Sequence, residues 1–294
     1  MEEGIVVRAI GGYFRVMLRD GRVVETRPRG RLRKERAAVL VGDRVDVAVQ
    51  ADGRGVIEKV HPRRTRLLRP PIANVDQVVV VMALADPPPN YGLLDRLLVA
   101  AHAAGIDPVV CWNKADLVTE AEVADAKGSY EAAGYPVVVT SAKSAAGVEA
   151  LARLLQGRVS TFAGPSGVGK SALLNRLHPD WKRETGAVSK KLGRGRHTTR
   201  AVELLALPGG GLVADTPGFS VLELRDIPAA RLSRFWPDLD RLSDQCRFPG
   251  CRHRSEPDCA VRRAAETGAV HPRRYQHYLD LLEEIEEWEA RRWS

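Results

Sequence analysis

The sequence lacks a long hydrophobic run and is poor in cysteine and aromatic residues. Among its 294 residues are four cysteines, and aromatic residues make up 5%. No apolar run approaches the ~18 residues that a membrane span needs. The first residues, MEEGIVVRAIGG, have neither the apolar core nor the cleavage site of a signal peptide. We therefore expect a cytoplasmic protein without a membrane partner.

An excess of acidic residues is also absent, because the formal net charge is +8. The positive charge is uneven. Residues 1–70 hold 17 Lys and Arg against nine Asp and Glu, and residues 161–225 hold ten against five. Such patches favour a phosphate-rich partner through counterion release. A solvated basic face is the alternative, and charge alone does not decide between them.

The N-terminal region is predicted to be a small β-barrel. Residues 4–60 contain five short β-branched runs separated by glycine turns. The basic excess favours an oligonucleotide-binding (OB) barrel, although an SH3-like barrel fits the same pattern. The basic segment 27–36 is either a loop that lines an RNA groove or a solvated one. We place an OB-fold RNA-binding domain at residues 1–68.

The central region, residues 69–225, alternates apolar strands with helices, which indicates a parallel α/β sheet. Strand segments begin at Gln77, Asp107, Pro136, Val159 and Gly211, with helices expected at 92–105, 120–133 and 147–156. From residue 226 the sequence is polar and rich in arginine. We expect a mainly α-helical, zinc-binding domain at 226–294, ending in a helix near 273–292. The apolar stripe of that helix is expected to pack in a core: Tyr278, Leu281, Leu282, Ile285 and Trp288.

The strongest chemical signal is a phosphate-binding P-loop between a strand and a helix. Its glycines let backbone N–H groups surround phosphates, its lysine reaches the β- and γ-phosphates, and its serine ligates Mg²⁺. The helix N-terminus adds a favourable dipole. The nucleotide-binding residues predicted here are Gly164, Pro165, Ser166, Gly167, Val168, Gly169, Lys170, Ser171 and Ala172.

Two further motifs identify the base as guanine. Asn113-Lys114-Ala115-Asp116 follows a buried strand, and Ser141-Ala142-Lys143 follows another. A carboxylate at Asp116 accepts from both N1–H and the exocyclic amine of guanine, a donor pair that adenine lacks. A backbone N–H of the second motif is placed to reach guanine O6. We therefore predict nucleotide contacts from Asn113, Lys114, Asp116, Ser141, Ala142 and Lys143.

A third motif, Asp215-Thr-Pro-Gly218, is predicted to sense the γ-phosphate. Asp215 would hold Mg²⁺ through water, and the Gly218 N–H would face the γ-phosphate. Either Thr198 or Thr199 would supply a second Mg²⁺ ligand. Phe219 stands where many GTPases carry a water-orienting glutamine, so His197 is our candidate for orienting water, with a surface histidine as the alternative.

The order of these motifs is permuted. Asn113-Lys114-Ala115-Asp116 and Ser141-Ala142-Lys143 precede the P-loop, whereas an ordinary GTPase has them last. A circular permutation is tolerated when the original termini lie close together. Because Gly218 leads directly into the C-terminal region, we hypothesise that the nucleotide state moves that region.

The C-terminal region contains a compact cysteine and histidine cluster. Three thiolates and one imidazole suit a closed, structural zinc site. The alternative is a set of buried, unligated cysteines. The predicted ligands are Cys246, Cys251, His253 and Cys259, with His271 and His277 as spare candidates.

Together these residues resemble the RsgA family, also called YjeQ, of small-subunit-dependent GTPases. The segments RPPIANVDQ, NKADL, GPSGVGKS, GRHTTR and DTPGF and the cysteine cluster occur in the family's order. The resemblance implies an OB domain, a circularly permuted GTPase core and a zinc domain. It also implies late 30S assembly, with binding near the decoding region of 16S rRNA, release of a bound assembly factor and 30S-stimulated GTP hydrolysis. The family's proposed switch histidine falls on His197.

Two other functions remain open from the sequence. One is an RNA-binding module in which GTP is structural. The other is a GTPase that acts on a protein or membrane partner, which the basic barrel disfavours. No heptads or repeats are present, so we expect a monomer that binds GTP or GDP with Mg²⁺ and carries one structural zinc ion.

Overall fold

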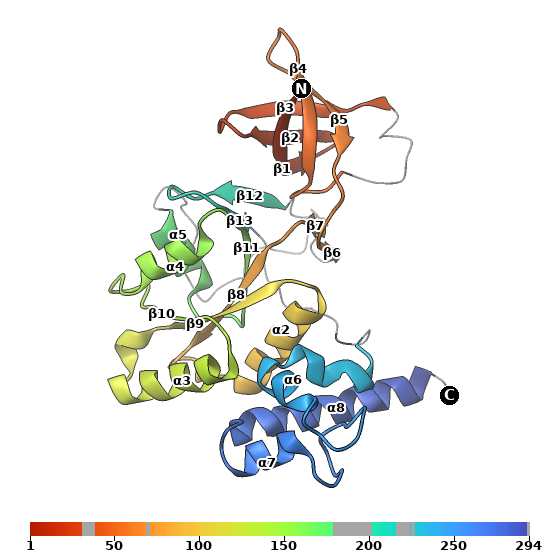
Figure 1. Cartoon of the computed structure of the whole chain (residues 1–294). Helices are drawn as coiled ribbons and strands as arrows, with labels where there is room; N and C mark the ends of the chain where they lie inside the picture. Colours follow the sequence, from red (N-terminus) through yellow and green to blue (C-terminus); the bar gives the residue numbers. More distant parts are fainter. Residues whose placement is uncertain (31–38, 69–70, 179–201, 216–223, 225–226, 293–294) are drawn as a thin grey trace, which may run out of the picture.

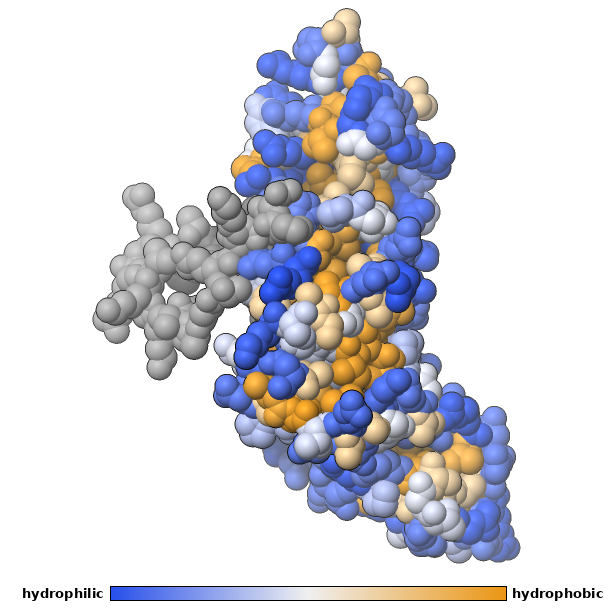
Figure 2. All heavy atoms as spheres, turned by 90° about the vertical axis from the view of Figure 1, so that its left-hand side faces the viewer, coloured by the Kyte–Doolittle hydropathy of each residue, from blue (hydrophilic) through white to orange (hydrophobic). Residues whose placement is uncertain are grey.

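The computed structural model describes residues 1–30, 39–68, 71–178, 202–215, 224 and 227–292. Three parts lie in a row, with a barrel at one end, a sheet in the middle and helices at the other end (Figure 1). On the face that Figure 2 shows, hydrophilic residues predominate at both ends, and hydrophobic residues gather along the middle. Among the described helices, none combines the length and apolar character of a membrane span.

The N-terminal part is a closed five-stranded barrel. Its strands are β1 (Glu2–Ile10), β2 (Tyr13–Leu18), β3 (Val23–Pro28), β4 (Arg44–Val49) and β5 (Gly55–Val60). In space they follow the order β1-β2-β3-β5-β4, and β1 also pairs with β4. Strand β5 thus lies between β3 and β4, parallel to β3. This Greek-key order is that of an OB-fold, not of a simple meander, so the predicted OB barrel is confirmed.

Alternating residues of the barrel strands fill its interior. Val6, Val16, Val45, Val47 and Ile57 are each 0% exposed and pack together in one cluster. Most of their neighbours along each strand are more exposed, as the period of two in a strand requires. At an irregularity in the pairing of β1, however, Val7 is buried as well as Val6.

The predicted connector at 61–74 contains structure that the sequence did not indicate. Strand β6 (Arg66–Leu68) pairs with β7 (Pro71–Ala73) in a small antiparallel sheet. The buried amide of Asn74 donates to the carbonyl of Gly42 at 3.0 Å. The connector is therefore attached to the barrel by side-chain as well as backbone contacts.

The central part is the predicted parallel sheet. Its strands are β8 (Gln77–Ala83), β9 (Asp107–Asn113), β10 (Val137–Val139), β11 (Val159–Ala163), β12 (Glu203–Ala206) and β13 (Leu212–Asp215). They lie in the order β10-β9-β8-β11-β13-β12, and only β12 is antiparallel to its neighbour in this set. β12 also bridges to β1 through Arg8 and Glu203, which the sequence did not predict.

Helices cover both faces of this sheet. They are α2 (Tyr91–Ala103), α3 (Glu120–Ala133), α4 (Val148–Leu155) and α5 (Lys170–Leu177). Every residue of β8 is buried, and alternate side chains enter different clusters. Val78, Val80 and Met82 pack with α2 and α3, whereas Val79, Val81 and Ala83 pack with α4 and α5. The continuous apolar run of β8 therefore reflects cover on both faces.

The C-terminal part is helical, as predicted. It consists of the 3-10 helix η2 (Ala229–Phe235), α6 (Pro237–Ser243), α7 (Ala260–Glu266) and α8 (Pro272–Arg292). The stripe predicted on the last helix packs here: Tyr278, Leu281, Leu282 and Ile285 are buried, and Trp288 is half-buried against them. The same core includes Val99 and Ala100 of α2, so this part shares its core with the central one.

A buried ion cluster also joins the C-terminal and central parts. Arg274 of α8 is 0% exposed, and its guanidinium donates two 3.0 Å hydrogen bonds to the carboxylate of Asp238. It also donates to Asp95 on α2, whose other oxygen lies 2.6 Å from His277 Nδ1. Burial alone would lower the pKa of Arg274, but Asp95 and Asp238 outweigh it and raise that pKa well above its usual value. The cluster thus carries a fixed positive charge between two carboxylates.

Candidate nucleotide site and zinc centre

The predicted nucleotide motifs meet at one edge of the central sheet. Strands β8, β9, β11 and β13 are parallel, so the loops at their carboxyl ends lie on the same side. From β8 the chain continues to β9 and β10 on one side, whereas β11 is followed by strands on the other side. Ligands of open α/β sheets bind at such a reversal of strand order.

Two glycines allow the P-loop to approach its neighbours closely. Gly164 has φ +130°, and a Cβ there would lie 2.1 Å from the carbonyl oxygen of Val81. Gly169 has φ +97°, and a Cβ there would lie 2.2 Å from Asn113 Nδ2. Both positions require glycine for conformation and for space. The phosphate loop and the loop after β9 are therefore packed directly against each other.

Lys170 begins α5, and its side chain turns back into the P-loop. Its ammonium donates to the carbonyls of Gly164 and Pro165 at 2.8 and 2.7 Å. Burial lowers the pKa of this lysine. The Lys170 ammonium is thus bonded to two carbonyls of its own P-loop. An incoming phosphate would compete with these carbonyls for the ammonium.

Asn113, at the end of β9, connects three loops. Its Nδ2 donates to Val168 of the P-loop at 2.8 Å. Its Oδ1 accepts from Thr140 Oγ1 at 3.1 Å and from the Ala142 N–H at 3.2 Å. The side chain is 1% exposed, so all of these contacts are made away from water. Asn113 therefore fixes the P-loop relative to both loops that are predicted to contact the base.

Asp116 lies in the 3-10 helix η1 (Ala115–Leu117) and accepts a hydrogen bond from Ser141 Oγ at 2.5 Å. This bond lowers the pKa of the Asp116 carboxyl. The carboxylate is therefore ionised near neutral pH, which a guanine acceptor requires.

The structure brings together most of the other predicted nucleotide residues. Pro165, Ser166, Gly167 and Val168 form the loop, and Ser171 and Ala172 follow Lys170 in the first turn of α5. Lys114 has φ +62°, and its ammonium donates to the carbonyl of Asp86 after β8. Lys143 lies in the turn beside Ala142. The backbone of Asp215 ends β13 at the same edge. Gly218, His197, Thr198 and Thr199 lie outside the described residues.

Two residues that contribute to this arrangement were missed in the sequence. Thr140 is buried and donates to Asn113, and Arg176 of α5 donates to the carbonyls of Ala142 and Lys143. A polar residue at the end of an apolar strand could have pointed to Thr140. No spacing rule connects Arg176 to a loop 33 residues earlier in the chain.

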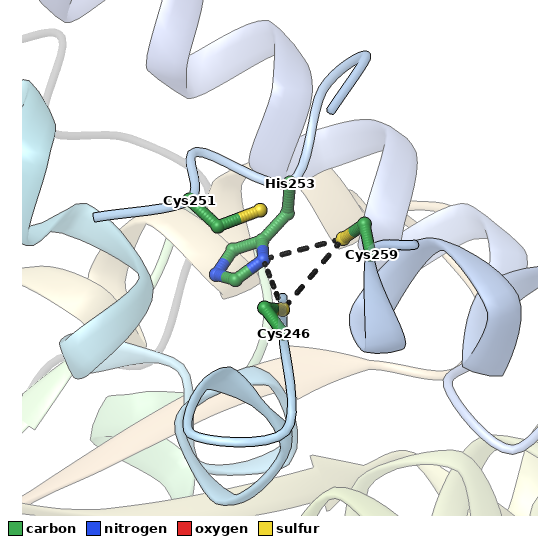
Figure 3. A group of neighbouring side chains, drawn as sticks. All are labelled: Cys246, Cys251, His253 and Cys259. Atoms are coloured by element: carbon green, nitrogen blue, oxygen red, sulfur yellow. Dashed lines mark hydrogen bonds between the residues drawn. The ribbon is translucent and has the colours of Figure 1, made fainter. Parts of the chain in front are cut away.

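The four predicted zinc ligands form one cluster. Cys246, Cys251, His253 and Cys259 offer ligand atoms that all lie within 4.8 Å of one another. Figure 3 shows their side chains pointing toward a common centre. The spare candidates lie elsewhere, since His277 contacts Asp95 and His271 accepts from the Arg273 N–H.

The spacings between three of these atoms fit a tetrahedral zinc ion. With Zn–S bonds of ~2.3 Å, tetrahedral geometry places sulfur ligands about 3.8 Å apart and a nitrogen slightly closer. Cys246 Sγ and Cys259 Sγ lie 3.9 Å apart, and each lies 3.5 Å from His253 Nδ1. The donor set and these three spacings are therefore consistent with a zinc site.

Ser243 determines which nitrogen of His253 faces the cluster. The Ser243 hydroxyl donates to the Leu239 carbonyl at 2.9 Å, and its oxygen lies 3.1 Å from His253 Nε2. With its proton committed to Leu239, the hydroxyl accepts from Nε2–H. The lone pair then resides on Nδ1, the atom that faces Cys246 and Cys259. Such partners orient metal-binding histidines in general.

We expect Ser243→Ala to weaken zinc binding about 10- to 100-fold, because the histidine loses the acceptor that selects its tautomer. Competition with a chromogenic chelator measures the affinity directly. Ser255→Ala is the matched control, since Ser255 is an exposed serine of the segment between Cys251 and Cys259. Equal zinc affinity in Ser243→Ala and the unmodified protein would contradict the assignment.

Comparison with known proteins gives one family. A profile of the RsgA GTPase matches residues 60–225, and a profile of the RsgA N-terminal domain matches residues 3–57. A relative from Moorella thermoacetica, named small ribosomal subunit biogenesis GTPase RsgA, is 48% identical over 283 residues, which cover 96% of this chain and 97% of the relative.

Two crystal structures have the same architecture. That of YloQ, described as a circularly permuted GTPase, has a TM-score of 0.85 and 37% identity, covering 98% of this chain and 96% of its own. That of YjeQ from Thermotoga maritima has a TM-score of 0.84 and 36% identity, covering 97% and 98%. Since the matches extend over nearly the whole chain, this protein belongs to the RsgA family of GTPases.

Proposed function

We propose that this protein hydrolyses GTP while it assists late maturation of the small ribosomal subunit. It binds the 30S subunit through 16S rRNA, and the subunit accelerates a slow intrinsic hydrolysis. Membership of the RsgA family supports this function, as does the printed name of its relatives, small ribosomal subunit biogenesis GTPase. The protein acts as a cytoplasmic monomer, with domains at 1–68, 69–225 and 226–294.

The observation that carries the proposal is the position of the Asp116 carboxylate. It is ionised, held by Ser141, and connected through the Asn113 loop to a complete P-loop. A carboxylate in this position accepts hydrogen bonds from the N1–H and the exocyclic amine of guanine, a pair of donors that adenine lacks. Guanine nucleotides are therefore the ligands that this edge of the sheet selects.

The residues predicted to lie around the phosphates have different roles. Lys170 exchanges its loop carbonyls for the β- and γ-phosphates, and Ser171 ligates Mg²⁺ together with Thr198 or Thr199. A magnesium ion held there would supply positive charge against the charge that develops on the phosphates. Asp215 would help to hold the ion, and the Gly218 N–H would sense the γ-phosphate.

Water is oriented by His197 in this proposal, because Phe219 has no hydrogen-bonding group. Intrinsic hydrolysis is slow when the residue that orients water reaches its catalytic position only in contact with a partner. Contact with 30S then places His197 for this role. This role for His197 rests on the sequence, since the residue lies outside the described part of the structure.

One face of the barrel is suited to RNA. Ile10, Tyr13 and Arg27 form a row across β1, β2 and β3, and the Arg27 guanidinium lies 4.2 Å from the centre of the Tyr13 ring. Tyr13 is 41% exposed, beside a cavity of about 240 Å³ that Arg8 and Arg15 also line, together with Glu25. An exposed aromatic ring among arginines binds unstacked bases and their phosphates. OB-folds use this part of the barrel for oligonucleotides.

The test is GTP hydrolysis by the protein alone, with 30S subunits, and with 50S subunits as control. We expect 30S to raise the turnover about 10-fold or more, and 50S to leave it unchanged. In Tyr13→Ala, more 30S is needed for half-maximal stimulation, whereas Val23→Ala, an exposed residue of β3, behaves as the unmodified protein. Tight guanine-nucleotide binding without 30S stimulation would point instead to a nucleotide-gated RNA-binding module.

A further inference from the structure

Arg176 connects the phosphate-binding helix to the loop that faces the base. Its Nε donates to the Ala142 carbonyl at 2.8 Å, and its Nη2 donates to the Lys143 carbonyl at 3.0 Å. Arg176 lies in the last turn of α5, where a cation also interacts favourably with the helix dipole. Its guanidinium, however, bonds to another loop and not to carbonyls of its own helix.

These two bonds orient two consecutive peptide planes. In a trans peptide the C=O and the following N–H point in opposite directions. Because the Arg176 guanidinium fixes the direction of the Lys143 carbonyl, the Ser144 N–H of the same peptide must point to the opposite side of the loop. There the Ser144 N–H donates to Ser141 Oγ at 3.1 Å.

Ser141 connects the Ser144 N–H to the Asp116 carboxylate through hydrogen bonds. With its oxygen accepting from the Ser144 N–H, the Ser141 hydroxyl donates its own proton to Asp116 Oδ1 at 2.5 Å. The carboxylate is exposed on one side and has no rigid packing of its own, because no residue of η1 is buried. Its direction therefore depends on the hydrogen bonds that reach it through Ser141.

We propose that Arg176 is a positioning residue for guanine selection, acting on Asp116 through Lys143, Ser144 and Ser141. The same helix begins with Lys170, so one rigid element sets the phosphate-binding cation and the base-binding carboxylate relative to each other. This inference rests on the proposed role of Asp116 in binding guanine.

The experiment compares dissociation constants for GDP and inosine diphosphate, measured by competition against a fluorescent GDP analogue. Inosine diphosphate keeps the phosphates and the N1–H but lacks the exocyclic amine, so it loses one of the two donors to Asp116. In Arg176→Ala the preference for GDP over inosine diphosphate falls about 5- to 10-fold, mainly through weaker GDP binding. Arg176→Lys, which keeps the charge but not the two-pronged geometry, gives an intermediate preference.

Arg153→Ala is the matched control. Arg153 is an exposed arginine of the adjacent helix α4, paired with Glu149 four residues away. This variant keeps the native preference. Thermal unfolding of all variants checks that they are folded.

Two outcomes would overturn the inference. A loss of affinity that is equal for both nucleotides would mean that Arg176 supports the phosphate side or the fold in general. Unchanged dissociation constants for both nucleotides would mean that the loop of Ala142 and Lys143 keeps its conformation without Arg176. Failure of the unmodified protein to bind GDP would instead refute the proposed function, so the two failures are distinguishable.

Discussion

Gly169→Ala is expected to weaken GDP binding by about 100-fold or more. The new Cβ would stand 2.2 Å from Asn113 Nδ2, and the residue would keep a left-handed φ of +97°. Such backbone strain costs roughly 1–3 kcal/mol, and loss of the buried bond from Asn113 to Val168 costs a further ~1–3 kcal/mol. Together these costs, roughly 2–6 kcal/mol, correspond to roughly 1.5 to 4.5 orders of magnitude in affinity. Titration with a fluorescent GDP analogue measures the effect.

A glycine elsewhere supplies the control. Gly128 lies in α3 with ordinary helical φ, and a Cβ there meets nothing within 4 Å. Gly128→Ala should therefore leave GDP binding unchanged and stabilise the helix by up to about 1 kcal/mol. A double-mutant cycle tests the cause. In an Asn113→Ala background, Gly169→Ala should cost less, because the clashing amide is gone. Additive losses would show that strain alone is responsible.

Arg274→Met is expected to lower the free energy of unfolding of the C-terminal part by about 3–5 kcal/mol. The substitution fills a similar volume but leaves Asp95 and Asp238 buried without their cation. Both carboxylates are almost fully buried, at 1% and 5% exposure. Hydrogen exchange of amides in α6 and α8 reports the loss locally, and chemical denaturation reports it for the whole chain.

The control for Arg274→Met is Arg153→Ala, which removes an exposed pair and should change stability by less than about 0.5 kcal/mol. The triple variant Arg274→Met, Asp95→Leu, Asp238→Leu should recover much of the stability, since no buried carboxylate is then left without its cation. If amide hydrogen exchange in α6 and α8 of the single variant Arg274→Met were as slow as in the unmodified protein, this account would be wrong.

The same cluster bears on the hypothesis that nucleotide state moves the C-terminal region. Arg274 and its partners attach α8 to α2, and Arg96 of α2 forms two further bonds with Glu284 at 2.6 and 2.5 Å. The shared core with Val99 and Ala100 adds apolar contact. We therefore expect any such movement to carry α2 with it.

The P-loop could be predicted from sequence because its chemistry depends on contiguous residues, from Gly164 to Ser171. The meeting of the two loops predicted to contact guanine could be foreseen because parallel strands bring their carboxyl ends to one edge. The cysteine cluster was local in sequence as well. In each case a short spacing and one general rule of folding were sufficient.

Pairings between distant charges could not be predicted in this way. Arg274 and Asp95 are 179 residues apart, and the chain offers 45 Lys and Arg and 37 Asp and Glu as possible partners. No pattern selects one pair among so many. The contact of Arg176 with the Ala142 loop is equally hidden, because carbonyl acceptors are present at every residue.

The bridge between β12 and β1 has a consequence for how copies of this protein meet. β12 would otherwise be the exposed edge of the central sheet, with unpaired backbone groups available to a strand from another molecule. Its pairing with β1 joins that edge to a barrel that is closed on itself. In the described part of the central sheet, the opposite edge is β10, which is only three residues long. The bridge to β1 thus occupies part of the β12 edge, and β10 is short, so the described central sheet offers little open edge to a strand of another molecule.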